Sequence, residues 1–154
     1  RCFDEIEYLN VDILGMKGKS RVITVPADIQ KLWNDVRVIL RNPVIARYEL
    51  KEDIQLGKKA GITALCEYSL LSDNEYPTYA ITKKEITESG IRKMKQVHSG
   101  EEIGCVVLEL GYFIDFKNKK LEDPLSVTLS LTESEKQDER IGISIKRMLE
   151  EYVW

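Results

Sequence analysis

The stretch CVVLELGYFIDF, residues 105–116, decides the fold, because it is a nearly continuous apolar run in a chain that is 32% charged. Such a run is typical of a strand covered on both faces, so we expect it at the centre of a sheet. Two further stretches rich in strand-forming residues, 44–50 and 78–82, are also predicted to be strands. A central sheet therefore organises the larger part of the chain.

Amphipathic patterns around these strands predict the helices that cover the sheet. Apolar residues recur at helical spacing over 29–40, where Asn42-Pro43 ends the pattern, and again after Gly61. A last helix near the C-terminus has an apolar stripe, which we expect to pack directly on the sheet, with Trp154 as an anchor. The stripe consists of Ile141, Ile145, Met148, Leu149 and Tyr152. The sequence thus predicts an α+β fold, in which an α/β domain over residues 26–154 has a small mixed sheet covered by helices.

Two segments are compatible with more than one structure. Residues 124–131 alternate between apolar and polar as a strand does, whereas Asp123-Pro124 is typical of a helix start. Residues 83–97 are polar and mixed, and fit either a helix or a solvated excursion. The sequence alone does not choose between strand and helix for residues 124–131, or between helix and solvated excursion for residues 83–97.

The N-terminal residues 1–25 have a pattern of their own. Residues 1–10 place Cys2, Phe3, Ile6 and Leu9 on one side of a helix, and strands are expected at 11–14 and 21–25. A helix followed at once by a hairpin with a basic tip is typical of the closing half of a winged helix-turn-helix. In that module the helix enters the DNA major groove and the hairpin, or wing, contacts the backbone.

This interpretation makes residues 1–25 the end of a winged helix, with Lys17, Lys19 and Arg21 as its DNA contacts. Most of the DNA contacts would then belong to a part of the module that precedes Arg1. The alternative is an ordinary surface hairpin, because turns need glycine and exposed strands tolerate lysine. Local charge favours neither, since residues 1–25 have four basic and four acidic side chains.

Composition limits the class of protein and its partners. The chain has 154 residues, is 43% hydrophobic and has a net charge of −3, as expected of a globular protein. Three unpaired cysteines indicate thiols in a reducing, cytoplasmic setting. No apolar run approaches the roughly 20 residues that cross a bilayer, so we expect no membrane partner. Residues 101–154 have 7 basic and 12 acidic side chains, which argues against a phosphate backbone at that end.

Catalytic patterns are weak. The one histidine, His98, stands in a polar stretch, and residues 15–20 end in Gly-Lys-Ser but lack the upstream glycine of a phosphate-binding loop. Asp115 and Lys117, with Glu109 before them, resemble the acid-and-lysine end of a nuclease strand. They belong to one strand segment, whereas a metal site needs acids from different elements. We therefore predict no catalytic residues, no metal site, no cofactor and no enzyme activity.

Several stretches are recognisable together through their order and spacing. They are GKSR at 18–21, NPV at 42–44, AGITAL at 60–65, PTYAI at 77–81, DPLS at 123–126 and MLEEY at 148–152. The set resembles a family of bacterial winged-helix, MarR-like transcriptional regulators, over residues 1–82 and 104–154. More loosely, the Ala-Leu helix and Pro-Thr-Tyr strand resemble the C-terminal domain of abortive-infection (type IV) antitoxins. The resemblance implies a DNA-binding module before a C-terminal domain, and it implies no catalytic residues.

Three functional hypotheses follow. The first is the C-terminal regulatory or dimerisation domain of a DNA-binding transcriptional regulator, with part of its winged helix. Its partners would be DNA and a second copy of the chain. The second is an antitoxin-like domain that binds a toxin protein, and the third, a remote one, is a metal-dependent nuclease using Asp115 and Lys117.

Overall fold

The computed structural model describes residues 14–24, 28–72, 75–114 and 119–154. It divides into two compact units, residues 1–41 with Trp154 and residues 42–153. The N-terminal helix expected over residues 1–10 lies outside the described residues, as do Asp115 and Lys117. The predicted end of the winged helix at residue 25 stays a prediction.

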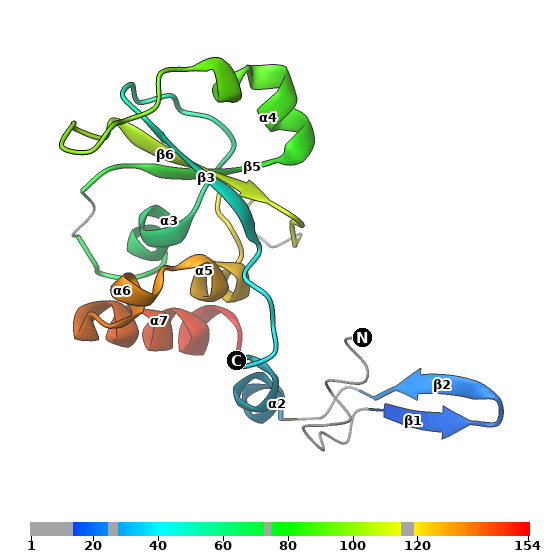
Figure 1. Cartoon of the computed structure of the whole chain (residues 1–154). Coiled ribbons are helices and arrows are strands. Elements are labelled where there is room, and N and C mark those ends of the chain that lie inside the picture. Colours follow the sequence, from blue (N-terminus) through cyan, green and yellow to red (C-terminus); the bar gives the residue numbers. More distant parts are fainter. Residues whose placement is uncertain (1–13, 25–27, 73–74, 115–118) are drawn as a thin grey trace. The chain divides into compact units, whose positions relative to one another are not determined.

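The first unit contains a hairpin and a short helix (Figure 1). Strands β1 (Leu14–Lys17) and β2 (Ser20–Ile23) pair in antiparallel fashion, which confirms the predicted hairpin with a shorter turn. Helix α2 (Ile29–Val36) begins where the Asp28 side chain accepts a hydrogen bond from the Lys31 backbone at 2.8 Å. The helix ends four residues before the predicted Leu40.

The second unit is built on a four-stranded mixed sheet. The strands are β3 (Val44–Leu50), β4 (Lys58–Lys59), β5 (Thr78–Thr82) and β6 (Cys105–Leu110), in the spatial order β3-β6-β5-β4. β6 runs antiparallel to β3 and parallel to β5. All six residues of β6 are buried, which confirms the predicted central strand. It ends at Leu110, so the strand is shorter than the predicted apolar run.

Helices cover both faces of this sheet (Figure 1). α3 (Gly61–Tyr68), α5 (Pro124–Ser130), α6 (Glu133–Lys136) and α7 (Glu139–Tyr152) lie on one side, and α4 (Lys83–Ser89) with the 3-10 turn η1 (Ile91–Lys93) on the other. Alternate residues of β6 serve the two sides: Val107 packs in a cluster with Ile86 of α4 and Ile91 of η1, whereas Val106 and Leu108 belong to a second cluster. The predicted α+β fold is confirmed.

Residues 124–130 are helical, whereas residues 83–97 contain α4, the turn η1 and a non-helical end in which Gln96 forms a β-bridge with Leu50. At the start of α5 the Asp123 carboxylate accepts a hydrogen bond from the Ser126 backbone at 2.9 Å, and Pro124 occupies the first turn. The polar segment 83–97 begins with a capping box, in which Thr82 and Glu85 bond to each other's backbone N–H groups. In both places the hydrogen bonds that cap the first turn favour the helical alternative.

The C-terminal helix differs from its prediction in what it contacts. α7 packs against α3, α5 and α6, with Met148 and Leu149 buried. Figure 1 places α3 and α5 between α7 and the sheet. The expected direct packing of α7 on the sheet is therefore wrong, because the helix layer next to the sheet is already filled.

Candidate nucleic-acid interface

The β1–β2 hairpin carries the predicted DNA contacts. Lys17 pairs with Ser20 at the end of the ladder, so Gly18 and Lys19 alone form the turn. Gly18 has a φ of 64°, which favours glycine, while a Cβ added there would meet no other atom within 4 Å. Glycine at this position is therefore required by the backbone of the turn and not by a close contact.

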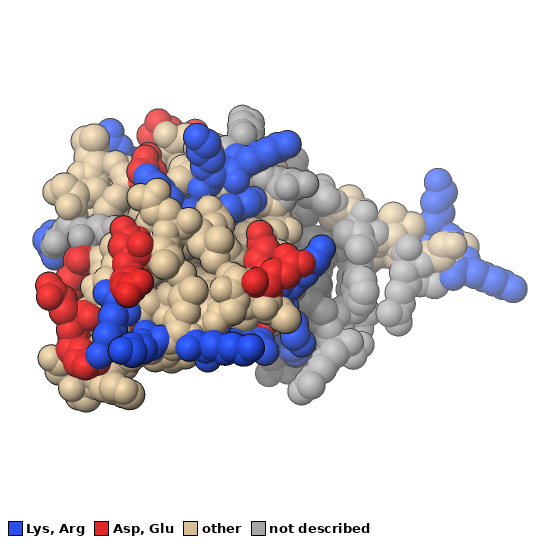
Figure 2. Space-filling model, turned by 90° about the horizontal axis from the view of Figure 1, so that it is seen from above, with Lys and Arg blue, Asp and Glu red and all other residues tan. Residues whose placement is uncertain are grey.

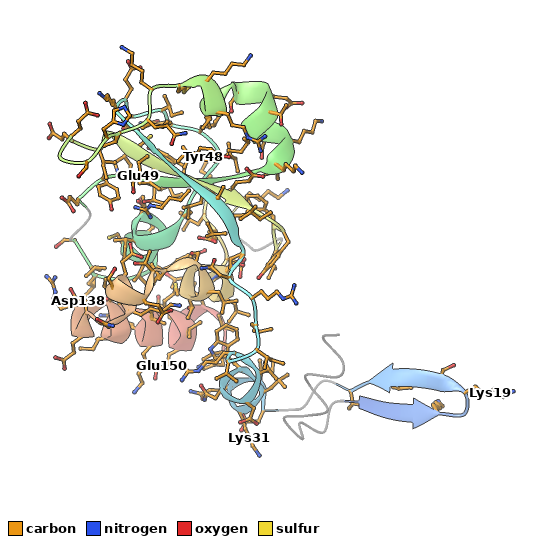
Figure 3. The ribbon with its side chains drawn as sticks, in the orientation of Figure 1. Lys19, Lys31, Tyr48, Glu49, Asp138 and Glu150 are labelled. Carbon is orange, nitrogen blue, oxygen red and sulfur yellow. The ribbon has the colours of Figure 1, made fainter. Side chains whose placement is uncertain are left out.

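The side chains at this tip are cationic. Lys17 and Lys19 are both exposed, and Figure 3 shows Lys19 at the end of the hairpin. Arg21, the third predicted contact, pairs with Met16 in the ladder. The structure therefore brings the three predicted residues into one hairpin.

Charge is distributed differently in the rest of the chain. Residues 1–41 have seven basic and six acidic side chains, whereas residues 42–153 have 16 basic and 20 acidic ones. On the face of the second unit seen in Figure 2, acidic and basic side chains are interspersed, while the hairpin shows basic ones. A polyanion is therefore matched best by the basic tip of the hairpin.

Glu109, the strand acid of the nuclease hypothesis, is already bonded within the fold. It is 3% exposed and accepts hydrogen bonds from the Tyr48 hydroxyl at 3.0 Å and from Arg92 Nη2 at 3.2 Å. These bonds explain how a carboxylate is buried in the central strand. Among the described residues no group of three or more His, Cys, Asp or Glu could hold a metal ion.

A second buried carboxylate, Glu122, was not singled out from the sequence. Its Oε2 accepts hydrogen bonds from the Gly61 backbone N–H at 3.1 Å and from Ser130 Oγ at 3.3 Å. Burial raises its pKa to about 7, so the carboxyl group is largely protonated in mildly acidic solution. Oε1 is buried with no hydrogen-bond partner among the described residues. The carboxylate thus binds the N–H group at the start of α3, and Gly61 lies 61 positions before Glu122 in the chain.

Two cysteines are described, and neither forms a disulfide. Cys105 is buried in the central strand, and burial raises the pKa of its thiol. A thiol with a raised pKa is a poor nucleophile. Cys66 is half-buried on α3.

Comparison with known proteins adds no relative: no protein-family model, no curated protein and no solved structure matches this chain. Within the described part, every helix is too short or too polar to span a bilayer. The functional argument therefore rests on the hairpin and on the surfaces of the second unit.

Proposed function

We propose that this chain is part of a DNA-binding transcriptional regulator of the cytoplasm. Residues 1–25 close a winged helix whose wing contacts the DNA backbone, and residues 26–154 form the regulatory domain. The observation that carries the proposal is the tight hairpin with Lys17 and Lys19 exposed at its tip.

The chemistry of the hairpin fits phosphate rather than base recognition. Lysine and arginine contact phosphates as cations, and such contacts fix the orientation of a protein on the duplex without reading sequence. Each phosphate neutralised releases condensed counterions, so the contribution weakens as salt rises. A wing with Lys17, Lys19 and Arg21 would therefore add affinity for any duplex.

The test is to replace these three residues with Ala in the full-length protein. Binding to a duplex from its own promoter and to a scrambled duplex is followed by fluorescence anisotropy at several salt concentrations. We expect weaker binding to both, and a log–log salt slope that is shallower by about 0.9 for each phosphate that the variant no longer neutralises. A matched control replaces Lys84, Lys93 and Lys95, three exposed cations of the second unit, with Ala.

The control removes the same net charge and should leave the slope nearly unchanged. If the hairpin variant keeps the affinity and slope of the unchanged protein, or if both variants bind more weakly to the same extent, the wing assignment is wrong.

A second candidate is an antitoxin-like function, in which the second unit binds a toxin protein. It is favoured by the acidic balance of residues 42–153, which would suit a basic partner. A nucleotidyltransferase-like toxin encoded beside the gene, forming a stable complex with this unit, would support it. Failure of the two products to associate when expressed together would oppose it.

A further inference from the structure

A pocket of 360 Å³ lies at the end of β3, and none of its lining residues belongs to the hairpin. Its volume is at the lower end of the range of about 300–1,000 Å³ that is usual for ligand sites, so its occupant would be a small molecule. We call it the Met94 pocket. Two segments that are distant in the chain line it: Leu50, Lys51, Glu52 and Ile54 form one wall, and Met94 and Lys95 form the other.

Hydrogen bonds hold both walls of the Met94 pocket in place. The Val97 N–H donates to the Glu49 carbonyl at 2.9 Å, which ties the segment after η1 to the outer edge of β3. On the other wall, the Cys105 thiol of the central strand donates to the Glu52 carbonyl at 3.2 Å. The fold itself therefore fixes the two walls relative to each other.

The floor of the Met94 pocket is apolar. Leu50 belongs to the buried cluster on the α4 side of the sheet, and Ile54 packs against the same cluster. Met94 is 41% exposed, and its unbranched thioether side chain adapts to apolar groups of different shape. The pocket therefore offers an apolar surface to a ligand side chain.

Three charged side chains line the pocket, and one of them is already paired. Lys51 Nζ bonds to Glu101 Oε1 at 2.5 Å. The side chains of Lys95 and Glu52 are exposed, and neither forms an ion pair or a hydrogen bond with any residue that the structure describes. One cation and one carboxylate are therefore available to a ligand.

The neighbouring charges do not alter this balance. Arg92 bonds to Glu109, and the Asp53 carboxylate accepts a hydrogen bond from the Tyr79 hydroxyl at 3.2 Å. Lys93 is exposed but does not line the pocket. The pocket thus combines an apolar floor with one unpaired charge of each sign.

A small molecule with both charges and an apolar body is complementary to this combination. A zwitterionic α-amino acid can place its carboxylate beside Lys95, its ammonium group beside Glu52 and an apolar side chain on the floor. A carboxylic acid without an amine would meet the like charge of Glu52, and an amine without a carboxylate would meet that of Lys95. The two unpaired charges therefore favour the amino acid over either of its single-charge analogues.

We propose that the Met94 pocket binds a free α-amino acid with an apolar side chain. This site goes beyond the function proposed above and does not rest on the wing. Its occupancy is measured on the full-length protein without DNA, so its failure is distinct from a failure of the wing assignment.

The ligand chemistry is tested by isothermal titration calorimetry with L-leucine, L-methionine and L-phenylalanine as probes. We expect at least one of them to bind with a dissociation constant below about 1 mM, which is reasonable for so small a ligand. For leucine the matched analogues are 4-methylpentanoate, which lacks the amine, and 3-methylbutylamine, which lacks the carboxylate. Each should bind about fivefold more weakly than leucine, because it loses one exposed charge pair and gains one repulsion.

The two charged side chains are tested with Lys95→Gln and Glu52→Gln. Each substitution should weaken amino acid binding about fivefold, because it removes one of the two charge pairs. Both positions are exposed, so the thermal midpoint should stay close to that of the unchanged protein. Lys93→Gln and Glu102→Gln are the matched controls, since both residues are exposed and neither lines the pocket. The controls should bind as the unchanged protein does.

The place of binding is tested by NMR of the ¹⁵N-labelled protein. Amide shifts on addition of the probe should concentrate in residues 50–54 and 94–97, and Met94→Asp, which puts a charge on the apolar floor, should abolish them.

Any of four results would overturn the proposal. They are no binding of the three amino acids at concentrations on the order of 10 mM, unchanged binding in both Gln variants of the pocket, an analogue that binds as tightly as leucine, and amide shifts that lie outside the two pocket segments.

Discussion

Replacing Glu122 with Gln should remove a pH dependence from the stability of the protein. The carboxyl group has a pKa of about 7 in the folded chain, raised from 4.5 mainly by burial. Below pH 4.5 it is protonated in both the folded and the unfolded state. Between pH 4.5 and 7 the unfolded chain loses this proton first, so the free energy of unfolding falls as the pH rises.

The size of the effect follows from the difference in pKa. A difference of one in pKa corresponds to about 1.4 kcal/mol. The ionised Glu122 therefore lowers the free energy of unfolding by roughly 3 kcal/mol above about pH 7. The Gln amide does not ionise and lacks this dependence. It can still accept the hydrogen bond from the Gly61 N–H, but its NH₂ group needs an acceptor, which adds a cost that does not vary with pH.

The measurement is urea unfolding of both proteins between about pH 4.5 and 8. The unfolding free energy of the Gln variant minus that of the unchanged protein should increase by roughly 3 kcal/mol as the pH rises across this range. Glu88→Gln, at an exposed position of α4, is the matched control and should show a constant difference. A constant difference for Glu122→Gln as well would mean that the buried carboxylate is ionised at every pH tested, and would refute the reasoning.

Two further predictions concern α7 and catalysis. Met148 is fully buried, so Met148→Ala should lower the free energy of unfolding by about 2–5 kcal/mol in a denaturant titration, and an unchanged midpoint would mean that α7 is loosely packed. Incubation with DNA or RNA in Mg²⁺ or Mn²⁺ should give no cleavage, and cleavage that disappears in Asp115→Ala would replace the prediction of no enzyme activity with the nuclease hypothesis.

The parts of the fold that the sequence predicted well depend on local pattern. The apolar run after Gly104 predicted a central strand covered on both faces, and β6 is such a strand, with β3 and β5 on either side. Alternation alone left 124–131 undecided, since Val127 in the helix and Leu131 at its C-cap are buried as they would be in a strand. The Asp123 cap, a single hydrogen bond to the Ser126 backbone, distinguishes the two structures.

The features that the sequence did not reveal depend on residues brought together from distant segments. Glu122 precedes a helix as many surface glutamates do, and nothing nearby in the sequence indicates that it is 1% exposed. Its environment is created by the start of α3, where the Gly61 N–H binds the carboxylate. The packing of α7 has the same origin: its apolar stripe requires a partner surface, but only the placement of α3 and α5 decides that helices, not strands, supply it.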